Sequence, residues 1–206
     1  MDVTRALAQI AEIHHQLAKT EIYRGYRPLP VAASGLAGLL AAMLQPHWMS
    51  ADPIAFVRYW SAVAAVAGSI GLVEVAWHYI VRDDASGRLR TRRVLGQFLP
   101  AVVAAAVLTV TFVRAGTTLV ALLPGVWAVC FGVGTFASRP YLPRTSVVAA
   151  LYYLAVGAIL LWTTNLQAPL NGWHVGATFA VGQLLAAGAL RSELEPDEQD
   201  APEPEV

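Results

Sequence analysis

WSAVAAVAGSIGLVEVAWHYIV, residues 60–81, is the stretch that decides the fold. It is a predominantly apolar run of about the 20 residues that an α-helix needs to cross about 30 Å of hydrocarbon. Two ionisable side chains, Glu74 and His78, interrupt it near its far end. Because a backbone inside a bilayer must satisfy its own hydrogen bonds, we expect a transmembrane helix that carries a polar pair.

The rest of the chain has the composition of a membrane protein. Of its 206 residues, 56% are hydrophobic and only 14% are charged, whereas about 25% are charged in soluble domains. We therefore expect an all-α fold, a polytopic membrane bundle of six transmembrane helices. The expected spans are residues 29–44, 60–81, 94–113, 117–137, 146–164 and 173–190. Pro100 and Pro124 fall inside the third and fourth of these and predict kinks.

Two segments flank this transmembrane domain of residues 29–190. Residues 1–28 have apolar positions near a 3–4 spacing, which predicts an amphipathic helix at the membrane interface. That helix would lead into the first span or offer a docking surface to a partner. Residues 191–206 contain seven acids, three prolines and few large apolar side chains, which predicts a disordered acidic tail. Folding of this tail back onto the arginine-rich residues 88–93 is an alternative.

The basic residues indicate how the chain threads the membrane. Twelve of its 14 arginines and lysines lie on one side of the predicted spans. They fall before span one, between spans two and three, between spans four and five, or after span six. Only Arg58 and Arg114 fall on the other side. Because bases are retained in the cytoplasm, both termini are expected there, in a bacterial inner membrane. The link between spans two and three is expected to be a cytoplasmic basic loop, with Arg88, Arg90, Arg92 and Arg93.

The six tryptophans support this threading. Trp48, Trp60, Trp162 and Trp173 fall at predicted outer ends of spans, as interfacial anchors do. Trp77 lies toward the inner end of span two. Trp127 is mid-span and is expected to pack between helices.

Glu74 and His78 are the strongest candidates for chemistry. They are four residues apart and therefore share one helix face. An ionised carboxylate inside the hydrocarbon costs at least about 2 kcal/mol, so Glu74 is expected to be protonated, paired or next to water. One interpretation is a proton or ion pathway, and the other is a structural hydrogen bond that fixes helix packing.

No other group of residues forms a catalytic constellation. His47 ends span one and His174 begins span six, so the two could meet at the outer face and ligate a haem or a metal. A third ligand is not apparent, and the one cysteine, Cys130, cannot form a cysteine metal site within one chain. No nucleotide-binding, hydrolase or metalloprotease motif is present in the sequence. We therefore expect no enzyme activity, no metal and no cofactor.

One stretch also resembles a known group of proteins. AQIAEIHHQLAKTEIYRGYRPLPVAASGLAGLLAAML, residues 8–44, and TRRVLGQFLPAV, residues 91–102, are similar to small bacterial six-span integral membrane proteins of unknown function. Such proteins look as if they are sometimes paired with a winged-helix transcription regulator. The resemblance therefore implies a sensory or regulatory role, and it supplies no catalytic residues.

The expected function is that of a regulatory, sensory or accessory subunit acting through protein contacts. Small residues four apart on spans two, four and six permit close helix packing, either inside the bundle or with a second copy or a protein partner. The other expected partner is the lipid bilayer, and no nucleic acid is expected. The alternatives are a proton-coupled transporter or channel using Glu74 and His78, and a haem- or quinone-associated subunit.

Overall fold

The computed structural model describes residues 28–46, 49, 51–77, 80, 85–142 and 144–192, with only the backbone of residues 74 and 85–90. Within these ranges every regular element is helical and none is a strand. Several predictions fall outside them: the surface helix at residues 1–27, the positions of His47 and His78, and the acidic tail from residue 193.

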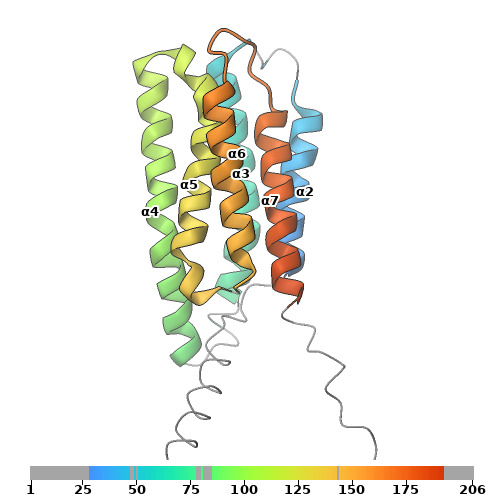
Figure 1. Cartoon of the computed structure of the whole chain (residues 1–206), viewed down its shortest axis with the longest axis vertical. Coiled ribbons are helices and arrows are strands. Elements are labelled where there is room, and N and C mark those ends of the chain that lie inside the picture. Colours follow the sequence, from blue (N-terminus) through green and yellow to red (C-terminus); the bar gives the residue numbers. More distant parts are fainter. Residues whose placement is uncertain are drawn as a thin grey trace, which may run out of the picture.

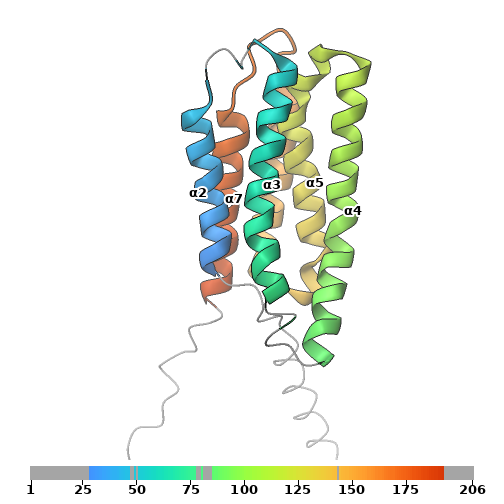
Figure 2. The same cartoon turned by 180° about the vertical axis from the view of Figure 1, so that it is seen from behind.

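The described chain forms a bundle of six α-helices that run alternately in opposite directions (Figures 1 and 2). The helices are α2 (Pro28–Leu44), α3 (Pro53–Trp77), α4 (Ala85–Ala115), α5 (Leu123–Ala137), α6 (Ser146–Thr163) and α7 (Trp173–Ser192). The 3-10 helices η3 (Thr117–Leu122) and η4 (Arg139–Tyr141) flank α5. Helices α2, α4 and α6 begin at the end of the bundle where α3, α5 and α7 finish, the lower end in Figure 1.

Five helical segments are long and apolar enough to cross a membrane, which indicates a membrane protein. They are residues 53–77, 91–115, 117–137, 146–163 and 173–192. The expected first span, residues 29–44, coincides with α2, which is apolar but has only 17 residues. At 1.5 Å per residue α2 is about 26 Å long, which is slightly less than a typical hydrocarbon core.

Helix α3 begins seven residues before the predicted start at Trp60. Asp52 Oδ1 accepts hydrogen bonds from the backbone N–H groups of Ile54 at 3.0 Å and Ala55 at 3.1 Å. Pro53 is the first helical residue, where its missing N–H is not needed. This cap places Arg58 inside α3 rather than in a segment leading up to it.

Helix α4 also differs from the prediction. It begins at Ala85, so residues 88–93 form its first turns and are not a loop. Its beginning projects beyond the ends of the neighbouring helices (Figures 1 and 2). The reason is that apolar content marks where a helix enters the hydrocarbon, while the hydrogen-bonded backbone continues beyond that boundary.

The two prolines differ in their effect. Pro100 lies inside α4 as predicted. Pro124 lies in the first turn of α5, where the α-helix starts after η3, so it begins a helix instead of interrupting one. The turn between α4 and η3 depends on Gly116, whose φ of 157° is a value that residues with a side chain rarely adopt.

Glycines bring the helices together in pairs. Helix α2 packs most extensively on α7, and α5 on α6. A Cβ added to Gly176 of α7 would lie 2.6 Å from the carbonyl oxygen of Gly38 in α2. On α5 and α6, a Cβ added to Gly125 or to Gly157 would lie 2.9 Å from the other's carbonyl oxygen. The chain therefore uses small residues where two backbones approach closely, as membrane bundles do.

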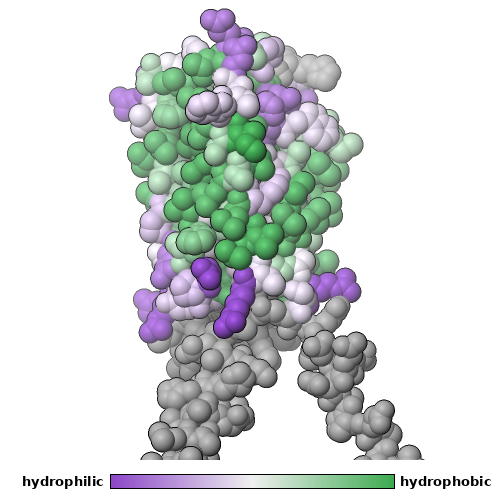
Figure 3. All heavy atoms as spheres, viewed as in Figure 1, coloured by the Kyte–Doolittle hydropathy of each residue, from purple (hydrophilic) through white to green (hydrophobic). Residues whose placement is uncertain are grey.

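The larger of the two clusters of buried apolar side chains among the described residues lies at the end of the bundle where α3 begins. Phe56 and Trp60 of α3 are buried there with Val120, Leu123 and Leu170. Away from such contacts the helices expose large apolar side chains, and Figure 3 shows them covering the middle of the visible face between more hydrophilic ends. This pattern fits a bundle surrounded by lipid along its middle.

Candidate functional site

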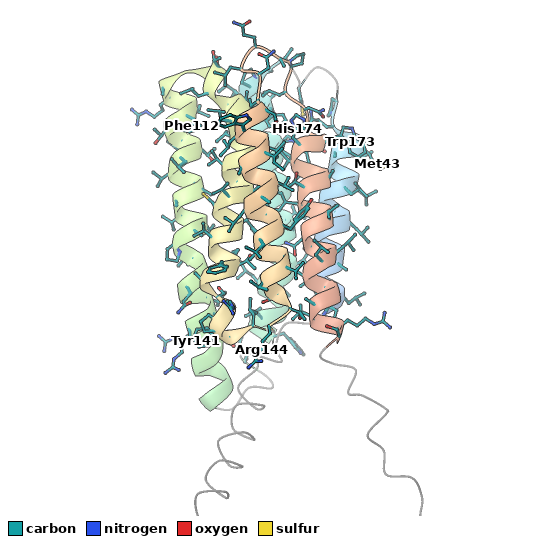
Figure 4. All side chains as sticks on the ribbon, viewed as in Figure 1. Met43, Phe112, Tyr141, Arg144, Trp173 and His174 are labelled. Carbon is teal, nitrogen blue, oxygen red and sulfur yellow. The ribbon has the colours of Figure 1, made fainter. Side chains whose placement is uncertain are left out.

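Arginines gather at the end of the bundle where α4 and α6 begin. The exposed side chains of Arg92, Arg93, Arg139 and Arg144 form what we call the arginine face. Figure 4 labels Arg144 and Tyr141 at this end and Phe112, Trp173 and His174 at the opposite end. Arg58 and Arg114 are exposed toward the opposite end. Of the arginines expected here, only the backbone of Arg88 and Arg90 is described, in the first turns of α4.

Helices α3 and α4 are the least enclosed spans of the bundle on the side chains described. From residue 61 to residue 77, only Val75 is buried. From residue 61 to residue 69, about two and a half turns, the exposed face consists of small residues, with Val66 as the only larger one. They are Ser61, Ala62, Ala64, Ala65, Gly68 and Ser69. The exposed faces of α6 and α7 instead carry large side chains such as Leu151, Ile159 and Leu184.

The glycines of α3 differ from the interhelical glycines of the other helix pairs. A Cβ added to Gly125 would meet backbone of α6, and one added to Gly176 would meet backbone of α2. A Cβ added to Gly68 or Gly71 would have no described heavy atom within 4 Å. Small residues in membrane helices are enriched where another helix approaches. In the described part of the chain, nothing approaches α3 at these glycines.

Glu74 lies on α3, and its backbone position fixes its face of the helix. Position 74 follows Phe56 by about five turns at 3.6 residues per turn, so the two share a face. That face contains buried Phe56 and Trp60 and the half-buried Ala67, and it turns toward the bundle. His78, the expected partner of Glu74, lies outside the described residues. The role of the pair therefore stays a prediction.

Buried hydroxyl groups lie at the same end of the bundle. Thr91, Ser138 and Ser146 are each at most 6% exposed, at the ends of α4, α5 and α6 nearest the arginine face. Ser138 Oγ donates a hydrogen bond to the carbonyl of Gly134 at 3.0 Å. No buried side-chain nitrogen or oxygen among the described residues lacks a hydrogen-bond partner. The Gly134 carbonyl also accepts a hydrogen bond from the Ser138 N–H at 3.1 Å, so Ser138 closes the last turn of α5 with two bonds.

The expected outer histidine site is described only in part. His174 is exposed in the first turn of α7, beside Trp173 (Figure 4). His47 lies outside the described residues. Within the described residues, no three histidine, cysteine or acidic side chains come together in a group that could hold a metal ion. The haem or quinone interpretation therefore stays an untested prediction.

Some tryptophans are exposed on the bundle surface, and others pack between its helices. Trp162 is 92% exposed, as expected of an interfacial anchor, but Trp60 is 3% exposed and belongs to the core. Its indole N–H donates to Gln45 Oε1 at 2.8 Å, which connects α3 to the end of α2. The interfacial interpretation of Trp60 was therefore wrong, because α3 begins two turns earlier than predicted. Trp127 packs between helices as predicted, and its N–H donates to Thr109 Oγ1 of α4 at 2.8 Å.

An aromatic cluster in the middle of the bundle was not foreseen. Phe98, Phe131, Tyr153 and Phe179 come from four different helices, with neighbouring ring centroids 4.8–5.3 Å apart. The Tyr153 hydroxyl donates to the carbonyl of Phe179 at 3.2 Å. Its ring lies against Gly182, where a side chain would collide with it. Single aromatics spread over four apolar runs give no sequence signal that they will meet.

No family model, no curated protein and no solved structure matches the chain. The functional argument therefore depends on the geometry described above.

Proposed function

We propose that this protein is a non-enzymatic, six-pass subunit of the bacterial inner membrane that regulates or assists another membrane protein. Its partner would be a transmembrane helix packed against the small-residue face of α3. The observation that carries this proposal is the row of exposed small residues around the open Gly68 of α3. The equally open Gly96 of α4 and Gly188 of α7 lie beside exposed leucines instead.

The six-pass topology is supported by α2. Although α2 has only 17 residues, it packs most extensively on α7, which is long enough to span the membrane. Its outward side chains, including Leu36, Leu40 and Met43, are exposed and apolar. A helix that follows a spanning neighbour and exposes such side chains belongs in the same hydrocarbon layer, and local thinning accommodates its shorter length.

The orientation is supported by the separation of the arginines. The arginine face and the end of α7 lie at one end of the bundle, and Arg58 and Arg114 lie toward the other. Arginine-rich connections are retained on the cytoplasmic side of inner-membrane proteins. The arginine face would thus be cytoplasmic, as would both chain termini.

The exposed face of α3 favours a protein over lipid as its neighbour. Lipid tails pack against large, mobile side chains as readily as against small ones, so lipid contact does not require alanine, serine and glycine on one face. Ser61, Ala65 and Ser69 recur at intervals of four, the spacing that lets two helix backbones approach closely. The Ser69 hydroxyl donates to the Val66 carbonyl at 2.7 Å, so this side chain lies close to its own helix.

Site-specific photo-crosslinking in intact cells tests this proposal. A photoreactive amino acid at Ala65 should give one discrete adduct with another membrane protein, and the same label at exposed Leu151 of α6 should not. Gly68→Leu should abolish the adduct, because the bulkier side chain holds the partner helix away, whereas Gly96→Leu on α4 should not. Equal labelling from positions 65 and 151 would show that lipid covers both faces. An adduct of two copies of this chain would replace the partner subunit with a homodimer.

A proton pathway through Glu74 is the second candidate. The helical register of residue 74, about five turns after the buried Phe56, supports this candidate, because an acid that faced a wet interior could exchange protons. Glu74→Gln should then abolish a pH-gradient-driven flux in proteoliposomes without changing thermal stability. Loss of thermal stability without any measurable flux in the parent protein would assign Glu74 a structural role.

A further inference from the structure

The arginine face lies beside the point where the described chain ends. The Thr145 hydroxyl donates to the carbonyl of Ala189 at 3.2 Å, which joins the residue after Arg144 to the last turn of α7. Ser192, the last residue of α7, donates its hydroxyl to the same carbonyl at 3.0 Å. Arg144 and the start of the segment that follows α7 are therefore neighbours in space.

That following segment has the opposite charge. Residues 193–206 contain seven acidic residues and no basic one. The exposed arginines of the face lie on η4, before α6 and in the early turns of α4. The one acidic side chain that the structure describes, Asp52, caps α3 at the opposite end of the bundle. Within the described residues, no acidic side chain is therefore available to compensate the arginine face.

The length of the segment is sufficient to cover the face. Fourteen residues extend up to about 46 Å at 3.3 Å per residue, whereas neighbouring helix axes are about 8–10 Å apart. Residues 193–206 can therefore pass Arg144 and Arg139 and reach Arg92 and Arg93 on α4. Because both ends of the contact belong to one chain, the effective concentration of the acidic segment at the face is in the millimolar range.

We propose that residues 193–206 dock on the arginine face and compete there with anionic lipid headgroups. Arginines just outside the hydrocarbon attract acidic lipids, and an acidic segment fixed beside them occupies the same positions. The chain would then regulate its own contact with the lipid surface through this segment. The inference requires only that the segment and the face share one end of the bundle, and it is independent of what covers α3.

Distance measurement between two spin labels tests the docking. Labels at Pro140→Cys and Ala201→Cys, in a Cys130→Ser background, are compared in phosphatidylcholine nanodiscs by double electron–electron resonance. At low salt we expect a narrow population at short distance. It should disappear at about 1 M salt, where the Debye length is about 3 Å. A distance distribution that does not change with salt would overturn the proposal.

Matched variants identify the arginines responsible. Replacing Arg92, Arg93, Arg139 and Arg144 by Gln should remove the short-distance population, whereas Arg58→Gln with Arg114→Gln at the opposite end should leave it intact. Salt titration of the parent protein keeps the test decisive if the fourfold variant does not fold. A short-distance population that survives in the folded fourfold variant would contradict docking on this face.

A lipid-binding experiment tests the competition. Changing the seven acids of the segment to amides should raise the binding of phosphatidylglycerol to the protein several-fold, measured by native mass spectrometry after titration into detergent. Equal binding by the parent and amide forms would show that headgroups, not the acidic segment, occupy the arginine face.

Discussion

The contact between Gly125 of α5 and Gly157 of α6 leads to a quantitative prediction about stability. A Cβ at position 157 would lie 2.8 Å from the backbone nitrogen of Val129 and 2.9 Å from the carbonyl oxygen of Gly125. Both are backbone atoms, so rotation of a flexible side chain cannot relieve the collision. In the variant Gly157→Ala the two helices must therefore move apart.

The expected loss follows from that movement. Restoring an ordinary separation of about 3.5 Å requires a shift of roughly 0.5–1 Å, which forfeits about a quarter to a half of the dispersion energy of the atoms involved. Overpacking of this kind destabilises by about 1–3 kcal/mol. Alanine gains roughly 0.5–1 kcal/mol over glycine in a helix interior, so Gly157→Ala should remain destabilised overall.

Gly96→Ala on α4 is the matched control. No described heavy atom lies within 4 Å of a Cβ added there, so this variant should be unchanged or slightly more stable. The assay is reversible unfolding in mixed micelles of a mild detergent and sodium dodecyl sulphate, followed by far-ultraviolet circular dichroism. If both variants shift the free energy of unfolding in the same direction, the close approach of α5 and α6 is wrong.

The remaining predictions concern other contacts of the bundle and its topology. Tyr153→Phe should lower the free energy of unfolding by about 0.5–1.5 kcal/mol, because it removes the hydrogen bond to the Phe179 carbonyl. Tyr153→Ala should lower it by about 3–5 kcal/mol, because it also leaves a cavity. Equal changes for the two variants in the same unfolding assay would contradict this. Gln45→Ala should destabilise by about 1–3 kcal/mol, because it leaves the buried Trp60 N–H without its acceptor, and Trp60→Phe in the same chain should recover part of that loss. A phosphatase reporter fused after Gly116 should be active in the periplasm and one fused after Ser192 should be inactive, whereas activity after Ser192 would reverse the proposed orientation.

Much of the helical architecture was predictable from the sequence because the bilayer restricts the choices. An apolar run of sufficient length must become a helix, since only a helix satisfies its own backbone inside hydrocarbon. The runs at residues 117–137, 146–164 and 173–190 accordingly match helical segments to within two residues, and the run at residues 94–113 lies inside the longer α4. The early start of α3 was also readable, because Asp52 followed by Pro53 is a helix-start signal.

The candidate site was predictable in type but not in location. Glu74 was identifiable because an acid in an apolar run is rare, yet its register toward the bundle required the burial of Phe56, Trp60 and Ala67. The open face at Gly68 could not be predicted. Ala64, Gly68 and Gly71 of α3 look the same in sequence as the glycines of α5, which are covered by α6 and α4.

The sequence by itself indicated most of the helical segments, the end of the bundle where arginines gather, and that this is a membrane protein. Only the tertiary structure decided that α2 packs on α7 and α5 on α6, that Trp60 is core and that α3 is left partly open. The physical reason is that lipid is as apolar as the helix surfaces. Hydrophobicity therefore places a segment in the membrane, but the choice of neighbour depends on the shapes of side chains that meet only in three dimensions.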